Sequence, residues 1–267
     1  MLKLTASFSA LLPGSLLLAF FSGGPLLADC LKEDSASSDF PESLVTTQLT
    51  SGVQSAWYDD ATKRYTHGVL GDSIEPSTLV VADEHGCTRS VVLDQEHVFE
   101  DLTPRLADID AIPGHEVVTV RSHRNYGAQL AIYQLAEDNI SLLTSTPYIG
   151  TSNRWLAPVG IADFNNDGDI DIAYVDRPHL AKTLRVWSYR DGKLEQIANK
   201  GGHSNHRIGE DFISGGIRTC DGITSMITAD ARWNRILETT LQNNQLVSND
   251  VGPFSGTDSF DQAMLCK

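Results

Sequence analysis

The chain has 267 residues, with 35 acidic and 20 basic side chains and a formal net charge of −15. An acidic surface repels phosphate backbones, so this charge balance excludes nucleic acid as a partner. The length is enough to bury a full hydrophobic core as one domain or one repeat array.

Residues 1–28 have the features of a cleaved secretory signal peptide. A short basic start at Lys3 precedes an apolar stretch at residues 16–21, and a run of small and apolar residues ends at Ala28. Glycine and proline interrupt the apolar stretch, which is too short to cross a bilayer. We therefore expect cleavage after Ala28, a single domain over residues 29–267, no stable membrane insertion, and a periplasmic or secreted location.

Four cysteines remain after cleavage, namely Cys30, Cys87, Cys220 and Cys266. An even number in an exported chain favours two disulfides, with three pairings open. None forms a C-x-x-C pair, which argues against a zinc or thioredoxin-type site. Because two cysteines lie at the ends of the mature chain, we expect a disulfide to hold a terminus. Lipid attachment is an alternative use of Cys30, although the acidic Asp29 departs from the small residue that a lipobox needs there.

The mature chain repeats a unit of short apolar strands joined by polar turns. The four units cover residues 56–93, 105–143, 158–197 and 216–248. Equivalent positions after the first strand of each unit are 49, 55 and 57 residues apart, and they are Asp59, Asp108, Asp163 and Cys220. In the first unit the strands are expected at residues 56–59, 64–70, 78–81 and 89–93.

Four antiparallel strands repeated at a period of about 50 residues are typical of a β-propeller blade. We therefore predict an all-β fold, a small propeller of four or five four-stranded blades. Residues before Gln48 and after Asp250 are available for a fifth blade. A plain β-sandwich is the alternative, and helical periodicity occurs only near residues 259–265.

The sharpest motif is the loop at residues 163–171, which lies between two predicted strands. Oxygen-bearing side chains occupy its positions one, three, five, seven and nine, and Gly168 is at position six. A loop turned at glycine can aim these oxygens at one point, as Ca²⁺ requires with its six to eight hard ligands. Mg²⁺ comes second because it demands a stricter octahedron. Tyr174 stands where an EF-hand needs a bidentate glutamate, and a turn without metal is the alternative.

A nine-residue acidic loop between two strands resembles the FG-GAP or VCBS-type repeat of β-propellers. The segments TSNRWLAPVGIAD, HLAKTLRVW and NHRIGEDFISGG are also similar to a group of bacterial exported proteins with such repeats. The resemblance implies a structural Ca²⁺ that braces the blade, but no particular activity. Its ligands would be Asp163, Asn165, Asp167, Asp169 and Asp171.

The other units depart from this pattern. The second unit has acids at positions one, three and nine, which are Asp108, Asp110 and Glu116. Its position five is Ile112, so we expect a weaker second metal loop there. The loop after Asp59 carries Lys63 at position five, which would repel a cation. The segment at Cys220 lacks the ligand set.

A polar constellation is expected where connections between strands converge on one face of a propeller. Its candidate ligand-binding residues are Arg154, Trp155, His206, Arg207 and Asp211. Trp155 could stack on a sugar or another flat ligand, and Arg207 could bind a carboxylate. The alternative is that these residues lock adjacent blades together.

No nucleophile elbow, zinc-protease motif, P-loop or dinucleotide fingerprint is present, so no catalytic residue is assigned. The leading hypothesis is a non-enzymatic binding or scaffold module for a protein or glycan partner. The alternatives are a carbohydrate-active hydrolase or lyase with its site on the channel face, and a structural accessory of a larger envelope assembly. The ligand and the oligomeric state stay open.

Overall fold

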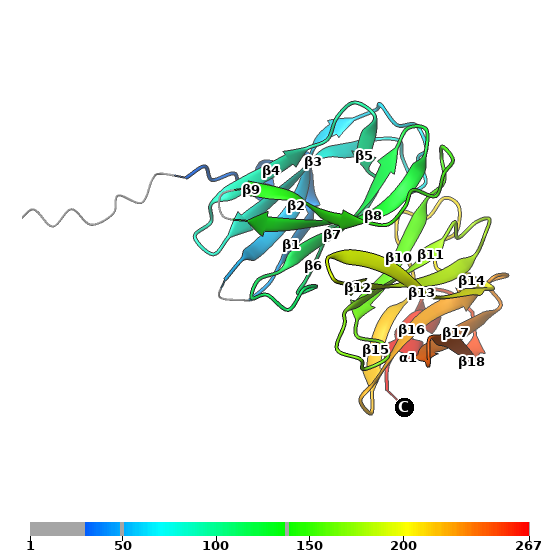
Figure 1. Ribbon diagram of the computed structural model, residues 1–267. Coiled ribbons are helices and arrows are strands. Elements are labelled where there is room, and N and C mark those ends of the chain that lie inside the picture. Colours follow the sequence, from blue (N-terminus) through cyan, green and yellow to red (C-terminus); the bar gives the residue numbers. More distant parts are fainter. Residues whose placement is uncertain (1–29, 49–50, 137–138, 267) are drawn as a thin grey trace, which may run out of the picture. The chain divides into compact units, whose positions relative to one another are not determined.

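The computed structural model describes residues 30–48, 51–136 and 139–266, and the predicted signal peptide lies outside this part of the chain. The strands belong to one compact unit, Leu31–Lys267. They form four antiparallel sheets, here called sheets I to IV, which follow one another along the chain (Figure 1). The fold is therefore all-β, as the alternating apolar segments predict.

Sheets I and III are simple four-stranded meanders. The strands of sheet I are β1 (Phe40–Thr46), β2 (Val53–Thr62), β3 (Glu75–Asp83) and β4 (Thr88–Val92). Those of sheet III are β10 (Leu156–Ala162), β11 (Asp171–Asp176), β12 (Thr183–Arg190) and β13 (Lys193–Gly201). In both sheets the chain order is also the spatial order.

Sheets II and IV have two short strands side by side in place of a single first strand. Sheet II contains β5 (His97–Phe99), β6 (Arg105–Ala107), β7 (Glu116–His123), β8 (Gly127–Ala136) and β9 (Asn139–Ser145). Sheet IV contains β14 (His203–Ser204), β15 (Gly216–Cys220), β16 (Ile223–Asp230), β17 (Arg235–Gln242) and β18 (Gln245–Pro253). In sheet II, β5 and β6 both pair with the same edge of β7. In sheet IV, β14 and β15 both pair with the same edge of β16.

Burial follows the position of a strand in its sheet. The inner strand β11 is buried at all six residues, whereas β12 alternates between buried and partly exposed positions. The middle of a strand covered on both faces is a continuous apolar run, here residues 172–175, but a strand with one solvated face alternates. The charged residues of β13 lie on an outer edge, where they discourage pairing with another chain.

The three largest clusters of the core join consecutive sheets, and two smaller ones lie within sheet I and within sheet IV with α1. Tyr58 and Leu79 of sheet I pack with Val117 of sheet II. A second cluster joins sheets II and III, and a third joins Val159 of sheet III to Met226 of sheet IV. Consecutive sheets therefore pack against each other, and closure of the series into a ring is not detected among the described residues.

The strands of the second, third and fourth units lie where the sequence predicts them, and in the first unit only the strand predicted at residues 64–70 is wrong. Residues 56–59 belong to the second strand of sheet I, and the predicted strand at residues 64–70 is irregular. The true first strand, β1, was missed because it contains Pro41 and Glu42 and lies largely exposed at a sheet edge. The loop expected after Asp59 is therefore wrong, since Asp59 is inside β2.

The segments reserved for a fifth blade complete sheets I and IV instead. Residues before Gln48 supply β1, and residues after Asp250 finish β18. The chain then forms the short helix α1 (Asp258–Met264), which confirms the helical periodicity near residues 259–265. None of the described helices is long and apolar enough to span a bilayer.

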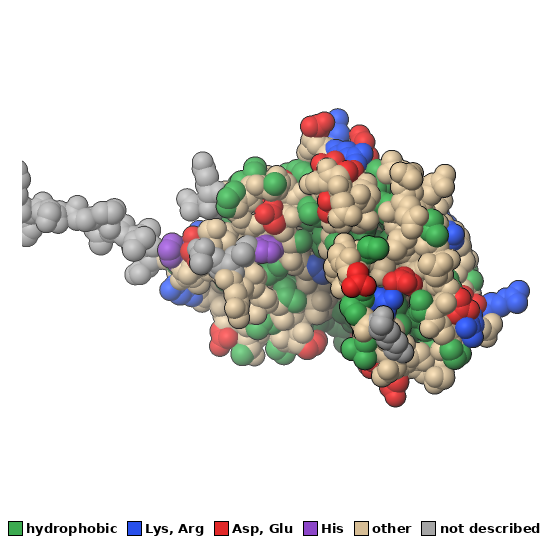
Figure 2. All heavy atoms as spheres, turned by 90° about the horizontal axis from the view of Figure 1, so that it is seen from below, with side chains coloured by type: hydrophobic (Ala, Val, Ile, Leu, Met, Phe, Trp, Pro, Cys, Tyr) green, Lys and Arg blue, Asp and Glu red, His purple; other side chains and the backbone are tan. Residues whose placement is uncertain are grey.

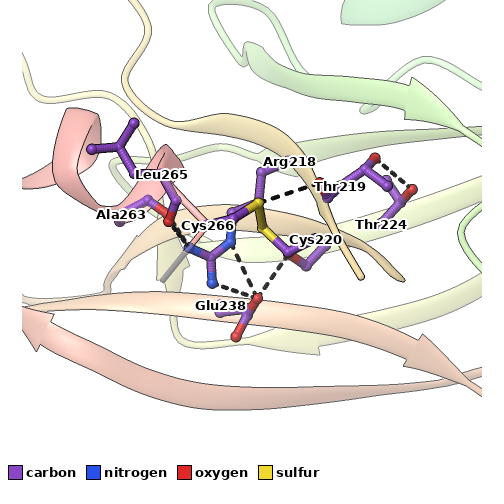
Figure 3. The surroundings of a disulfide bond; sticks show 9 residues. Arg218, Thr219, Cys220, Thr224, Glu238, Ala263, Leu265 and Cys266 are labelled. Carbon is purple, nitrogen blue, oxygen red and sulfur yellow. Dashed lines mark hydrogen bonds and ion pairs between the residues drawn. A yellow bond between two sulfur atoms is a disulfide. The ribbon is translucent and has the colours of Figure 1, made fainter. Parts of the chain in front are cut away.

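All four cysteines are in disulfides, as expected for a protein of an oxidising compartment. Cys220 at the end of β15 pairs with Cys266 after α1, so one bridge holds the C-terminus. Figure 3 shows Arg218 beside this bridge, where its guanidinium donates to the carbonyl of Leu265 (3.0 Å) and to Glu238 (2.7 Å). This ion pair lowers the pKa of Glu238.

The arrangement of acidic side chains can be followed on one face of the molecule. On the face drawn in Figure 2, Asp and Glu side chains are scattered among apolar and basic ones instead of forming one patch.

Candidate metal centre and ligand-binding cavities

Two acidic loops occupy equivalent places in sheets II and III. In sheet II the loop leaves β6 at Ala107, which pairs with Glu116 at the start of β7. In sheet III the loop leaves β10 at Ala162, which pairs with Asp171 at the start of β11. Position nine of each loop is thus the first residue of an inner strand, directly across from the residue before position one.

The carboxylate at position nine has the same role in both loops. Glu116 accepts a hydrogen bond from the backbone N–H of Ile109 (2.7 Å), and Asp171 accepts one from the N–H of Phe164 (3.1 Å). Burial raises the pKa of the Glu116 carboxyl to about 7 and that of the Asp171 carboxyl to about 6, and the other acids of each loop add to the shift. Each loop therefore holds a buried carboxyl beside like charges, an arrangement that a bound cation would relieve.

In the loop of sheet II three carboxylates converge. One oxygen from each of Asp108, Asp110 and Glu116 lies within 4.8 Å of the other two, and we call this group the acidic triad. Asp108 is exposed, Asp110 is partly exposed and Glu116 is buried. Carboxylate oxygens at this spacing could hold a divalent cation, with carbonyl oxygens and water completing the shell.

In the loop of sheet III the carboxylates bond mainly to the protein itself. Asp163 accepts from the backbone N–H groups of Asp167 (3.2 Å) and Gly168 (2.9 Å). Arg190 at the end of β12 donates to both Asp167 and Asp169. Asp171 is fully buried, and its Oδ1 has no hydrogen-bond partner among the described residues. That oxygen fits a site for a cation, even though Arg190 already supplies a positive charge to the loop.

The loop whose carboxylates converge is not the loop that the sequence predicts as the main metal site. Within the described residues, the acidic triad is the group of three carboxylates with ligand atoms in mutual reach, whereas the sequence ranks this loop second. Asn165 donates its amide to Asp167 (2.8 Å). The segment after Cys220 is a two-residue turn before Ile223, in keeping with its missing ligand set.

The two acidic loops line one cavity of 370 Å³. Asp108 and Asp110 contribute from sheet II, and Asp169 contributes from sheet III. Tyr189 and Arg190 of β12 also line it, and burial raises the pKa of the Tyr189 phenol. Loops that are 55 residues apart in the sequence are therefore neighbours in space.

No protein-family model matches the chain, and no curated protein matches it either. The site is therefore interpreted from its geometry.

The structure splits the predicted ligand-binding face. Arg154 and Trp155 line a cavity of 210 Å³ together with His67 and His179, and the ring of His206 packs on Trp155 with centroids 5.1 Å apart. The two other predicted residues lie elsewhere. Arg207 packs over the rings of Trp233 and Phe254 and pairs with Glu210, and Asp211 lines a different cavity.

Trp155 has a structural role in addition to lining this cavity. It is 2% exposed, and its indole N–H donates to the carbonyl of Glu100 (2.9 Å) in sheet II. The residue therefore connects the start of β10 to the preceding sheet. This contact, like the stacking of Arg207, favours the interpretation in which these side chains lock adjacent sheets.

The histidines of the cavity form a chain with defined tautomers. The carbonyl of Glu210 can only accept, so Nε2 of His206 donates to it (2.9 Å). Burial lowers the pKa of His206, and burial with the neighbouring His206 lowers that of His179 to about 4, so both rings are neutral. Nδ1 of His206 then accepts from Nε2 of His179 (2.8 Å). Nδ1 of His179 keeps its lone pair.

Two groups of candidate functional residues have no signal in the sequence. The first is Glu100, a fully buried carboxylate that bonds to His67 and Ser122. The second is a set of carboxylates around Glu75, described below. Both sets combine residues from distant segments, and no local motif signals them.

Proposed function

We propose that this protein is an exported, calcium-stabilised β-propeller that acts as a non-enzymatic binding or scaffold module for a protein or glycan partner. The observation that carries the proposal is the pair of acidic loops at equivalent places in sheets II and III. Each loop joins an outer strand, β6 or β10, to the inner strand beside it, and the carboxyl at its position nine is buried. A Ca²⁺ ion there would neutralise like charges and hold two strands together.

Several features support a propeller of the FG-GAP or VCBS type. The chain consists of four successive antiparallel sheets that pack in series, and the acidic loops recur at one place in two of them. Radial repetition would protect the sheet edges from pairing with other chains. The disulfides and the predicted signal peptide support export to the periplasm or the medium.

A carbohydrate-active hydrolase is less well supported. Such enzymes use two carboxyl groups, one as an acid and one as a free base or nucleophile. Glu75 and Asp101 do share a cavity, but Asp101 already accepts two hydrogen bonds from Arg105 and one from the N–H of Val120. An acid whose oxygens are committed in this way is a poor base, which favours binding over hydrolysis.

The test is thermal unfolding of the mature protein with Ca²⁺, with Mg²⁺ and with a chelator. We expect a Ca²⁺-specific rise in melting temperature of about 5 °C, which is the order expected for an ion at a large excess over its Kd. A double variant, Asp110→Asn with Asp167→Asn, removes one acid from each loop at almost constant volume and should lose the rise. A wild-type melting temperature that does not change with Ca²⁺ would refute the calcium role.

A further inference from the structure

A second acidic cavity, of 330 Å³, is lined by sheets I and II and by a connection of sheet IV. Five carboxylates line it, namely Glu42, Asp72, Glu75, Asp101 and Asp211. They come from β1, the β2–β3 connection, the start of β3, the segment after β5 and the β14–β15 connection. The lining includes no Lys, Arg or His, and we call this cavity the acidic pocket.

The two buried acids of the acidic pocket differ in how they are compensated. Asp101 accepts from both terminal nitrogens of Arg105 (2.7 and 3.0 Å) and from the hydroxyl of Tyr58 (3.3 Å). Glu75 is only 4% exposed, and its carboxylate has no hydrogen-bond or ion-pair partner among the described residues. A buried carboxyl without a partner is costly, so it points to a partner from outside.

The surroundings of Glu75 are negative. Burial raises its pKa to about 9, and the charges of Glu100, Asp72 and Asp101 raise it further in that order. Glu100 is bonded to His67 and Ser122 rather than to Glu75. No basic side chain lines the pocket, and Arg105 pairs with Asp101, so a cation that enters would be stabilised mainly by Glu75 and Asp72.

The walls of the acidic pocket decide which cation fits. Its other lining residues are mostly apolar, namely Phe40, Leu70, Ile74, Pro76 and Leu102. Its carboxylates do not form a group of three ligand atoms within 4.8 Å, which in the described chain occurs only at the acidic triad. A bare divalent ion is therefore a poor match. An ammonium group on an alkyl stem matches both features, because its methylenes can lie on apolar walls while its charge meets a carboxylate.

We propose that the acidic pocket binds a primary alkylammonium group, supplied by a lysine side chain of a protein partner or by a free polyamine. The proposal names the chemistry of the ligand for the binding module above and rests on that role. The ammonium would sit against Glu75, with Asp72 and Asp211 at the exposed rim.

The test is calorimetric titration of the mature protein at pH 8 with three probes. Nα-acetyl-lysine methylamide represents a partner's lysine, spermidine represents a free polyamine, and Nα-acetyl-norleucine methylamide has the stem without the charge. We expect both amines to bind at least about tenfold more tightly than the norleucine probe, as for a charge-assisted contact. The tighter of the two amines identifies the source of the group.

Variants assign the binding to this pocket. Glu75→Gln should weaken amine binding at least about tenfold, because the ammonium binds the ionised form of the Glu75 carboxyl, which releases its proton when the amine binds, whereas glutamine keeps the shape but cannot ionise. Glu42→Gln, at an exposed rim position where folding is not at stake, should weaken it about two- to threefold. Glu96→Gln changes an exposed acid outside the pocket and serves as the matched control.

Equal binding of the norleucine probe, or unchanged amine binding in Glu75→Gln, would overturn the proposal. The result is separable from the calcium test. Amine binding that persists without any Ca²⁺ effect on melting would support the pocket and refute only the calcium role. A retained Ca²⁺ effect with no amine binding would refute only the pocket.

Discussion

The acidic loops of sheets II and III have the same position in the fold but compensate their charges differently. The loop at residues 163–171 has more oxygen-bearing side chains, yet Arg190 and backbone N–H groups already bond to them. The loop at residues 108–116 has fewer acids, and they converge within 4.8 Å. The number of acids in a motif therefore does not by itself decide how many carboxylates are free of internal partners, because a basic side chain from a neighbouring strand can bond to the same oxygens.

The largest expected effect concerns Glu75, a buried carboxyl outside both loops. It shows what burial of a carboxyl costs at a place without a metal-binding motif. In the unfolded chain it ionises near 4.5, but in the folded protein its pKa is about 9. The folded state therefore keeps a proton that the unfolded state loses, so stability falls as pH rises from about 4.5 to about 9. Glu75→Gln should remove this fall and raise the free energy of unfolding at pH 8 by on the order of 3 kcal/mol.

Urea unfolding of both proteins between pH 4 and pH 9 measures this effect. The two should have similar stability near pH 4, where the carboxyl is protonated in both states. Parallel pH profiles for wild type and variant would contradict a raised pKa at Glu75.

The next effect separates the two loops. Asp110→Asn breaks the acidic triad and should reduce the Ca²⁺-induced rise in melting temperature by about 4 °C. Asp167→Asn should leave most of that rise, because Asp167 is already paired with Arg190. The measurement is thermal unfolding with and without Ca²⁺, and the reverse order of the two variants would make the sheet III loop the main site.

Adding an acid to the weaker motif should sharpen the comparison. Ile112 stands at position five, where the other loop has Asp167, and it is 65% exposed, so its replacement sacrifices little packing. Ile112→Asp should tighten Ca²⁺ binding about tenfold, since the number of charged ligands tunes such sites. Calorimetric titration with Ca²⁺ measures the change, with Ile112→Asn as the uncharged control. Equal affinities of the two variants would show that position five does not reach the ion.

The smallest expected effect tests competition by Arg190. Arg190→Gln removes the internal counter-ion from Asp167 and Asp169 and should increase Ca²⁺ affinity at this loop by about two- to fivefold, as expected for an exposed ion pair. Calcium titration in an Asp110→Asn background isolates the sheet III loop. A weaker affinity after the substitution would show that Arg190 orders the loop for the ion instead of competing with it.

Much of the fold could be predicted because its signals are local. The apolar run at residues 172–175, the alternation at residues 184–187 and the Asp191-Gly192 turn mark three strands of sheet III. The first strand of sheet I could not be found in this way. The residues of β1 do not alternate between polar and apolar, because the strand lies at a sheet edge. Tyr65 and Val69 give residues 64–70 the apolar pattern of a strand, although both side chains are buried in an irregular connection.

The candidate site was predictable in part for the same reason. Asp108, Asp110 and Glu116 are close in sequence, so their pattern indicates a loop with converging oxygens. The ligand-binding face was split, because the positions of Trp155, Arg207 and Asp211 depend on how the sheets pack.

The amino-acid sequence by itself determined the two acidic loops, the turns and most of the strands, with β1 as an exception, since each depends on residues within a few positions of one another. Only the tertiary structure decided which loop has converging carboxylates and which has Arg190 across it. It also decided that Glu75 is buried beside Asp101 without a partner. Burial and charge pairing depend on distances between segments that the chain separates by tens of residues, and electrostatic energies in a low-dielectric interior change strongly with those distances.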